Sequence, residues 1–248
     1  MQNFTTASLK GHRDMEEQIL RLQNYINGSR YTVAITGAGI SMAAGIMDFA
    51  HMNFPLVLQM SSSAVLKSAP NHYYNTARKA FLDAMFENGP SVAHKKLAEY
   101  ERHGLLQGII TTNIDCLHTL AGSRNVAEIQ GSFGFNKCLK CGQEYNDVQI
   151  WNQGKAPRCE KCGGVIGAFP VYKHIGLVED EVRKARSFAA QAELVIIIGA
   201  QGSYGGVYYP YIRSGARVVQ INPKATQFDD VAVLNIRKGA DEVFCMLS

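Results

Sequence analysis

Short apolar segments of strand length alternate with helical patterns along most of this chain of 248 residues. Neighbouring parallel strands need a long crossover connection, and a helix usually provides it. The alternation therefore predicts an α/β fold with a doubly wound parallel sheet. We expect strands at residues 31–36, 107–111, 126–129, 194–198 and 217–221. We expect helices at residues 14–27, 71–88, 91–103 and 181–192, and another from Met42 onward.

Length and composition suit one large domain, or one domain with a small insertion. The net charge of +4 is compatible with an anionic ligand such as a dinucleotide, but it does not mark a nucleic-acid partner. The longest apolar run, residues 194–198, is far too short to cross a bilayer, and the N-terminus has no apolar signal core. We therefore expect a cytoplasmic protein with no membrane partner.

A glycine-rich segment joins the first expected strand to the helix from Met42. Gly37 and Gly39 would let the backbone turn tightly and approach a pyrophosphate, and the helix N-terminus would point N–H groups at its charge. The spacing is not the full dinucleotide fingerprint, and no acidic residue follows about 20 positions later. The alternative is a turn whose glycines only let neighbouring elements pack closely.

Four cysteines form two C-x-x-C pairs separated by 17 residues. They are Cys138 with Cys141, and Cys159 with Cys162. This spacing is typical of a zinc site. Four thiolates complete a tetrahedral shell with no open position, which predicts a structural Zn²⁺ rather than a catalytic one. Cys245 has no partner in the pattern, and we expect it in the core.

Three motifs precede the cysteine pairs. They are Gly37-Ala38-Gly39-Ile40-Ser41, Thr111-Thr112-Asn113-Ile114-Asp115 and Glu128-Ile129-Gln130-Gly131. In this order, with the cysteine pairs after them, they resemble the sirtuin family of NAD-dependent enzymes. The resemblance implies a Rossmann-like core and a small second domain. The core would be residues 1–48, 89–134 and 175–248, and the second domain a helical lid, residues 49–88, with a zinc module, residues 135–174.

The resemblance also implies how NAD, the family's co-substrate, is bound. Asp115 would hold the nicotinamide carboxamide, and Asn113 the ribose or a water near its C1′ atom. Either residue could instead cap a helix that follows the strand. Asn222 would contact the adenosine ribose, and Asp241 would lie near the adenine. The implied cofactor-binding set is Gly37, Ala38, Gly39, Ser41, Asp48, Phe49, Thr112, Asn113, Asp115, Gln130, Gly199, Ser203, Asn222 and Asp241. The implied catalytic residues are Asn113, Asp115 and Gln130.

Gln130 departs from the family, because sirtuins normally have their catalytic histidine at this position. In deacylation that histidine takes a proton from a ribose hydroxyl, which needs a base with a pKa near neutrality. A glutamine amide can hold the hydroxyl by hydrogen bonds but cannot accept its proton. Losing such a base usually costs roughly 10²–10⁴-fold in rate. His174 is a candidate replacement, although a lone histidine in a polar loop is more often only solvated.

Other departures lie in the NAD and peptide sites that the resemblance implies. Ala50 replaces an arginine that reaches the NAD phosphates in the family, and Thr112 replaces a glutamine. Residues 168–177 lack the F-G-E stretch that clamps an acyl-lysine peptide in deacylases. Two changes in the machinery of one reaction favour a different activity.

The sequence therefore predicts an NAD-dependent protein ADP-ribosyltransferase that releases nicotinamide. It resembles a histidine-lacking bacterial branch of sirtuins, some of which modify lipoyl-carrier proteins and are linked to macrodomain proteins. The resemblance thus implies a protein acceptor, with a lipoylated carrier as one candidate, and a macrodomain ADP-ribosyl hydrolase as a further partner. The alternatives are an NAD-dependent protein-lysine deacylase, an NAD glycohydrolase, and a non-catalytic sensor of NAD or ADP-ribose.

Overall fold

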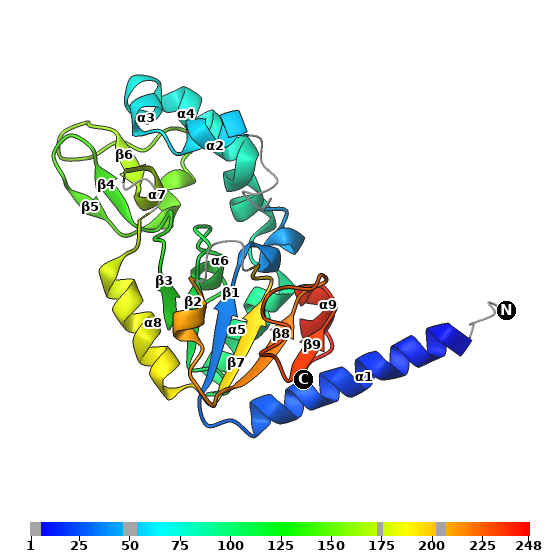
Figure 1. Ribbon diagram of the computed structural model, residues 1–248. Coiled ribbons are helices and arrows are strands. Elements are labelled where there is room, and N and C mark those ends of the chain that lie inside the picture. The colour runs from blue at the N-terminus through cyan, green and yellow to red at the C-terminus, as the bar shows by residue number, and fades with distance from the viewer. Residues whose placement is uncertain (1–5, 47–53, 173–175, 202–206) are drawn as a thin grey trace.

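The structure is a computed structural model that describes residues 6–46, 54–172, 176–201 and 207–248. Its centre is a six-stranded parallel sheet with the order β3-β2-β1-β7-β8-β9 (Figure 1). The strands are β1 (Thr32–Thr36), β2 (Gly108–Thr111), β3 (Val126–Glu128), β7 (Leu194–Ile198), β8 (Arg217–Ile221) and β9 (Leu234–Ile236). The order reverses between β1 and β7, and ligands of such sheets bind outside the carboxyl ends of the strands at that point. The predicted doubly wound parallel sheet is confirmed.

Apolar side chains alternate between the two faces of the sheet. In β7, Ile196 and Ile198 belong to one buried cluster, whereas Val195 and Ile197 belong to another. This is the two-residue repeat of a strand that is covered on both sides. The longest apolar run of the sequence is therefore a strand buried at the centre of the sheet.

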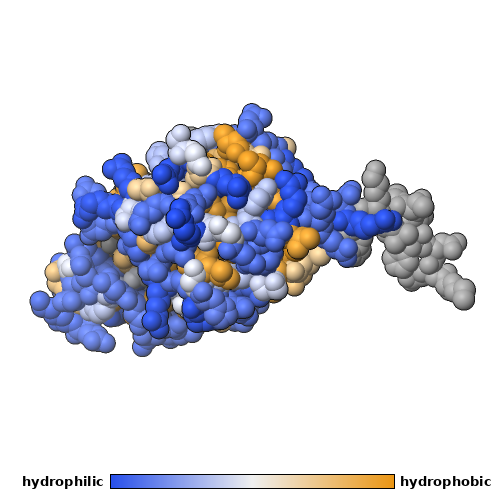
Figure 2. Space-filling model, turned by 90° about the horizontal axis from the view of Figure 1, so that it is seen from below, coloured by the Kyte–Doolittle hydropathy of each residue, from blue (hydrophilic) through white to orange (hydrophobic). Residues whose placement is uncertain are grey.

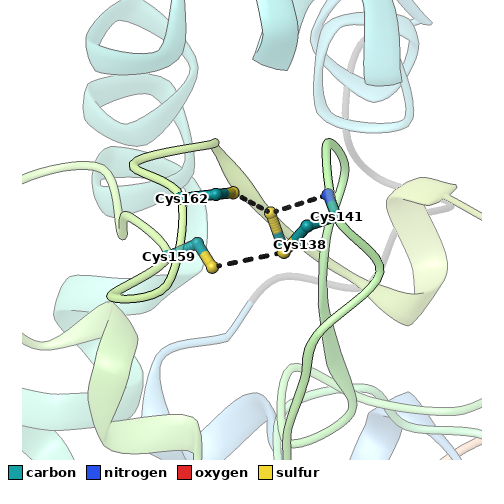
Figure 3. A group of neighbouring side chains, drawn as sticks. All are labelled: Cys138, Cys141, Cys159 and Cys162. Atoms are coloured by element: carbon teal, nitrogen blue, oxygen red, sulfur yellow. Dashed lines mark hydrogen bonds between the residues drawn. The ribbon is translucent and has the colours of Figure 1, made fainter.

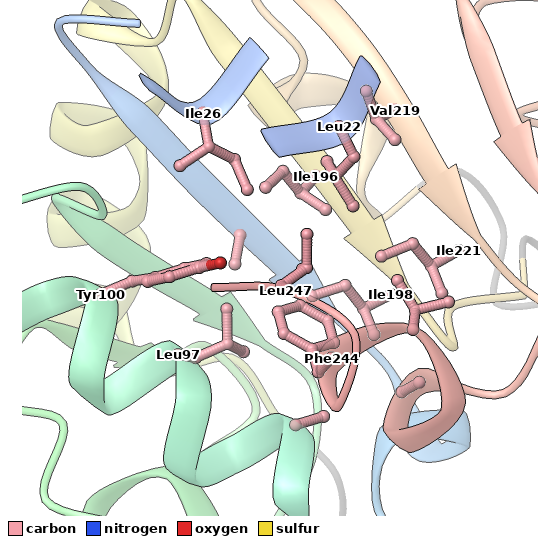
Figure 4. Packing of buried hydrophobic residues seen from close by; sticks show 14 of the residues in the cluster. Leu22, Ile26, Leu97, Tyr100, Ile196, Ile198, Val219, Ile221, Phe244 and Leu247 are labelled. Atoms are coloured by element: carbon pink, nitrogen blue, oxygen red, sulfur yellow. The ribbon is translucent and has the colours of Figure 1, made fainter. Parts of the chain in front are cut away.

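Helices cover both faces. They are α1 (Thr6–Asn27), α5 (Val92–Arg102), α8 (Glu179–Gln191) and α9 (Ala240–Phe244). Leu22 and Ile26 of α1 pack with Leu97 of α5 and Phe244 of α9 on one face (Figure 4). Ala185 and Ala189 of α8 pack on the other face. The N-terminal half of α1 extends past the edge of the sheet (Figure 1).

A second group of elements lies beyond the carboxyl ends of the central strands (Figure 1). One segment contributes α2 (Phe54–Met60), α3 (Ser63–Ser68), α4 (Pro70–Ala77) and the π-helical turns Arg78–Leu82 and Ala84–Asn88. A later segment contributes β4 (Asn136–Cys138), β5 (Glu144–Tyr145), a 3₁₀ turn at Val148–Trp151, β6 (Ile166–Ala168) and α7 (Phe169–Tyr172). The strands of this group form an antiparallel sheet.

The two segments of this second group share one apolar core. The fully buried indole of Trp151, from the later segment, packs near Tyr73 of α4, with ring centroids 6.4 Å apart. Its ring also meets Phe133 edge-on at 5.1 Å. Tyr74 donates a hydrogen bond to the Trp151 carbonyl at 3.1 Å. The helices of the first segment are therefore packed against the cysteine-rich segment, although 77 positions of sequence separate the two hydrogen-bonded residues.

The structure corrects some sequence predictions. The helix α1 begins at Thr6, earlier than predicted, because its first residues carry no apolar periodicity that would mark them. The strand β9 and the helix α9 were not predicted, since each is five residues or fewer. Cys245 is exposed rather than in the core.

Among the described residues, no helix is both long enough and apolar enough to cross a membrane. Figure 2 shows the molecule from below, where hydrophilic side chains cover most of the surface and hydrophobic ones gather in separate patches. The exposed large apolar side chains of the described chain include Leu20, Val231 and Val233. Single exposed apolar side chains are normal on a protein surface.

Candidate active site

Three polar side chains meet at the carboxyl ends of β1 and β2, the central strands of the sheet. The Ser41 hydroxyl donates to Asp115 Oδ2 at 2.7 Å. The Asn113 amide donates to Ser41 Oγ and to the Gly37 carbonyl, each at 3.2 Å. The N–H of Leu117, the first residue of α6 (Leu117–Leu120), donates to Asp115 Oδ1 at 3.0 Å. Cys116, not Asp115, is the N-cap of this helix, and the other oxygen of Asp115 connects the Asn-Asp motif to the glycine loop.

The glycines of the loop are required by a backbone contact. The Gly39 N–H donates to the Gly199 carbonyl at 2.9 Å. A Cβ added to Gly39 would lie 2.7 Å from Gly199 Cα, and one added to Gly199 would lie 2.4 Å from the Ile40 nitrogen. Gly199 also has a left-handed φ of +57°, which glycine adopts readily. Close packing is therefore one reason for these glycines, and it places Gly199 beside the loop.

The helix predicted from Met42 onward is absent from residues 37–46. Two one-turn 3₁₀ helices, Ala38–Ile40 and Met42–Ala44, take its place. Gly45 ends the second turn with a φ of +82°. This prediction was wrong because a left-handed glycine stops the helical run after a single turn. The argument from the N-terminus of a long helix therefore does not apply to this part of the loop.

Gln130 lies in the turn after β3, the strand next to β2. The Gly131 N–H donates to the Glu128 carbonyl at 2.8 Å, and Gly131 has a φ of +68°. A Cβ on Gly131 would lie 2.3 Å from Cδ1 of Phe169, so the first residue of α7 covers this turn. The half-buried side chain of Gln130 has no hydrogen-bond partner within the described parts of the chain. Its amide is therefore available to a ligand.

A buried carboxyl group lies beneath this turn. The Ser132 hydroxyl donates to Glu128 Oε2 at 2.7 Å and accepts from the Gly134 N–H at 3.0 Å. Burial raises the pKa of Glu128 to about 7, well above its ordinary value. Sequence reasoning did not single out this buried carboxyl, although an acidic residue at the end of an otherwise apolar strand was an available signal.

Tyr208 is a second residue that sequence reasoning missed. Its hydroxyl is hydrogen bonded to the hydroxyl of Thr112 and donates to the Thr36 carbonyl at 3.2 Å. Its ring is buried and meets Phe228 edge-on at 6.3 Å. Tyr208 therefore joins the ends of β1 and β2 from a distant part of the chain, and no spacing in the sequence indicated this contact.

The remaining predicted site residues are less closely connected. Asn222 lies at the end of β8, where its amide donates to the Ala200 carbonyl at 3.2 Å. Asp241 lies on α9, where its carboxylate accepts the Ala93 N–H at 3.0 Å and so caps α5. The predicted residues Asp48, Phe49 and Ser203 lie outside the described residues, as do Ala50 and His174.

Two more side chains near the Asn-Asp motif are buried. His118 is 2% exposed, and its Nε2 lies 2.9 Å from the Thr36 hydroxyl, which shows that it is a packed, hydrogen-bonded histidine. Burial lowers the pKa of His118 well below its ordinary value. Cys116 is buried, and burial raises the pKa of its thiol, which makes it a poor nucleophile.

The four predicted cysteine ligands converge (Figure 3). All their Sγ atoms lie within 4.8 Å of one another, with Cys138 and Cys162 3.5 Å apart and Cys141 and Cys159 3.6 Å apart. A tetrahedral Zn²⁺ with Zn–S bonds of about 2.3 Å requires sulfur atoms about 3.8 Å apart. The donor set and its spacing therefore fit a structural zinc ion.

The backbone forms the same turn around each of the two C-x-x-C pairs. The Gly142 N–H donates to the Cys138 carbonyl at 3.0 Å, and the Gly163 N–H donates to the Cys159 carbonyl at 2.8 Å. The Tyr145 hydroxyl donates to Cys159 Sγ at 3.1 Å, and this hydrogen bond lowers the pKa of the thiol to about 6. This hydrogen bond therefore favours the thiolate form of Cys159, the form in which a cysteine binds a metal.

Comparison with known sequences places these features in one family. The profile of the Sir2 family matches residues 37–204. An NAD-dependent protein deacetylase of Pyrobaculum aerophilum is 35% identical over 92% of this chain and 92% of its own. An NAD-dependent protein deacetylase of Thermotoga maritima is 34% identical over 84% of this chain and 88% of its own.

Comparison with solved structures finds the same family. A solved structure described as Sir2 with a p53 peptide and NAD⁺ superposes with a TM-score of 0.73 at 32% sequence identity. The match covers 91% of this chain and 95% of that one. The similarity therefore includes both the central sheet and the elements beyond its carboxyl edge.

Proposed function

The chain belongs to the Sir2, or sirtuin, family of NAD-dependent enzymes, and we propose that it is a protein ADP-ribosyltransferase. In this reaction the bond between nicotinamide and ribose breaks, nicotinamide leaves, and the ADP-ribosyl group joins a protein side chain. The acceptor that the family resemblance suggests for a first test is a lipoylated carrier protein.

The observation that carries the proposal is the amide of Gln130. It is half-buried in the turn after β3, where the family resemblance places the catalytic histidine. An amide donates and accepts hydrogen bonds but takes no proton near neutral pH. Gln130 can therefore orient a ribose hydroxyl, but it cannot serve as the general base of deacylation.

No neighbouring group in the described chain replaces that base. Both oxygens of Asp115 are engaged, by Ser41 and by the Leu117 N–H. His118 is buried beneath the site with its Nε2 on Thr36. Glu128 has a suitable pKa of about 7, but its carboxyl is buried and accepts from Ser132. His174, the replacement that the sequence suggests, lies outside the described residues.

The remaining groups suit cleavage of the nicotinamide–ribose bond. Asn113 and Asp115 are buried, and their mutual connections through Ser41 give both a fixed orientation. Fixed dipoles and charges stabilise a reaction better than mobile ones, since little reorganisation is needed. This step needs positioning and electrostatic stabilisation more than it needs a base at position 130.

The second candidate is an NAD-dependent protein deacylase. It is favoured by the relatives, since those with about a third of their residues identical are named deacetylases. Deacylation by this chain would have to tolerate the amide at position 130. The two candidates therefore differ in one measurable property, the fate of an acyl-lysine peptide.

The deciding experiment is intact-mass analysis after incubation with NAD, an acyl-lysine peptide and a lipoylated carrier protein. We expect the protein to add one ADP-ribose mass to the carrier and to leave the peptide acylated. Gln130→His is the matched variant, because it restores the residue that deacylases of the family have. Peptide deacylation by the unmodified protein at a rate near that of Gln130→His would overturn the proposal and favour the deacylase.

Two further outcomes would indicate a different function. Nicotinamide release without any protein adduct would indicate an NAD glycohydrolase. Tight NAD binding without nicotinamide release would indicate a sensor. Asn113→Ala is the control for site assignment, because it removes the amide that connects the loop and the Asn-Asp motif while the sheet is left intact. Unchanged nicotinamide release by Asn113→Ala would refute the assigned site.

A further inference from the structure

Five polar side chains form a line beneath the candidate site, from α9 to the end of β1. The Ser91 hydroxyl donates to Asp241 Oδ1 at 2.8 Å and lies 3.0 Å from His94 Nδ1. The His94 and His118 rings are 4.7 Å apart between centroids, at an angle of 56°. His118 Nε2 lies 2.9 Å from the Thr36 hydroxyl. Four elements, α9, α5, α6 and β1, thus contribute to one polar path through the core.

The direction of the hydrogen bonds is fixed at the Asp241 end. The carboxylate accepts from Ser91 Oγ and from the Val92 and Ala93 N–H groups, so it acts only as an acceptor. The single proton of the Ser91 hydroxyl is used by that bond. Ser91 Oγ must therefore accept from His94, which places a proton on His94 Nδ1 and leaves Nε2 of the neutral ring as an acceptor.

Two nitrogen atoms in the middle of the line have no partner. They are His94 Nε2 and His118 Nδ1, both fully buried and without a hydrogen bond to any described residue. Buried polar atoms are paired in nearly all native proteins. The ring centroids lie only 4.7 Å apart, and a hydrogen bond between these two nitrogens requires that one donates and the other accepts.

Only one arrangement of neutral rings satisfies both nitrogens. If Thr36 donates to His118 Nε2, then His118 Nδ1 carries a proton and can donate to His94 Nε2. If His118 instead donates to Thr36, two acceptor nitrogens face each other in the core, which is unfavourable. Burial also lowers the pKa of each ring, which keeps both neutral.

We propose that Ser91, His94 and His118 are positioning residues that form a one-directional hydrogen-bond relay from Thr36 to Asp241, closed by a direct bond between the two rings. Every proton in the relay points from β1 toward the carboxylate. The relay fixes the hydroxyl of Thr36, the last residue of β1, from below the site.

Thr36 is the residue through which such a relay would act on the site. Its carbonyl accepts from Tyr208 at 3.2 Å and from the Thr112 N–H at 3.4 Å. The next residue, Gly37, accepts from the Asn113 amide at 3.2 Å. A displacement of Thr36 would therefore move the glycine loop and the Asn-Asp motif together. This link to activity rests on the proposed NAD site.

The direct test is nitrogen NMR of the protein with ¹⁵N-labelled histidine, with signals assigned by their loss in His94→Gln and His118→Gln. We expect both rings to be neutral with the proton on Nδ1, and we expect a scalar coupling between His118 Nδ1 and His94 Nε2. A proton on Nε2 of either ring, or the absence of this coupling, would overturn the relay. This measurement needs no NAD and no activity, so it stands even if the proposed function fails.

The functional test compares Ser91→Ala with Ser91→Thr. Ser91→Ala removes the acceptor of His94, so we expect both rings to move their protons to Nε2 and the relay to reverse. Ser91→Thr keeps the hydroxyl, so we expect the original protonation. One buried hydrogen bond is worth about 1 kcal/mol, so the Kd for NAD in Ser91→Ala is expected to rise roughly fivefold by calorimetry. Unchanged ring protonation and unchanged Kd in Ser91→Ala would overturn the proposal, as would equal loss in Ser91→Thr.

Discussion

Replacing Glu128 with glutamine tests how strongly the core beneath the Gln130 turn depends on pH. Burial raises the pKa of Glu128 from 4.5 to about 7, so the folded protein retains a proton that the unfolded chain releases. Since the folded state binds more protons between these values, the stabilising contribution of the neutral carboxyl is present below pH 4.5 and is lost as pH rises through 7. Glu128→Gln removes this dependence, because its amide stays neutral and can still accept from Ser132.

The size of the effect follows from the two pKa values. The rise from 4.5 to about 7 corresponds to about 3 kcal/mol when the whole titration is covered. Between about pH 5.5 and pH 8.5, where a zinc–thiolate centre can be kept loaded, about 2 kcal/mol of this remains. The new amide N–H₂ group adds its own cost, but that cost does not change with pH.

The assay is urea unfolding of both proteins at about pH 5.5 and pH 8.5 in zinc-containing buffer. We expect the free energy of unfolding of the wild type, relative to Glu128→Gln, to fall by about 2 kcal/mol between the two pH values. Glu181→Gln is the comparison variant, since the Glu181 carboxylate accepts the Glu128 backbone N–H and its charge also raises the pKa of Glu128. We expect it to reduce the pH dependence without removing it. A difference between wild type and Glu128→Gln that is equal at both pH values would refute the reasoning.

Three further predictions concern the metal, the loop contact and the missed tyrosine. Cys138→Ser is expected to release zinc and to lower the unfolding temperature, whereas Cys245→Ser, at an exposed cysteine, is expected to retain zinc in metal analysis. Gly199→Ala is expected to cost more than about 2 kcal/mol in urea unfolding, since its Cβ would meet backbone atoms. Gly104 also has a positive φ, but a Cβ there would meet open space, so Gly104→Ala is expected to cost only about 1 kcal/mol. Equal losses of stability in Gly104→Ala and Gly199→Ala would show that the backbone contact of Gly199 is unimportant. Tyr208→Phe is expected to lose about 1 kcal/mol of stability, and an unchanged unfolding midpoint would contradict its role in joining the strand ends.

The central sheet was predictable because its strands are apolar and end in glycine or polar residues. The strand β7 lies at Leu194–Ile198, as the apolar run indicated, and β8 at Arg217–Ile221. The cysteine centre was predictable as well, because the spacing of its ligands is itself the signal. Such local patterns act over a few residues and need no knowledge of tertiary contacts.

Features of a second kind depend on contacts between distant segments. The helical run from Met42 ends after one turn at the left-handed Gly45, and Gly39 packs against the backbone of Gly199, a contact that the local pattern does not contain. The capping of α5 by Asp241 joins residues about 150 positions apart. Tyr208 reaches Thr112 over a separation of 96 residues. No pattern of spacing encodes such pairs, so they could be known only from the folded chain.

The packing of Trp151 against the helices that precede β2 has a consequence for engineering. Two insertions into the Rossmann-like core, far apart in the sequence, share one apolar core of their own. A chimera that exchanged only the cysteine-rich insertion would remove the indole that packs against Tyr73 and Phe133. Exchanging these elements between relatives therefore requires both insertions to move as one module.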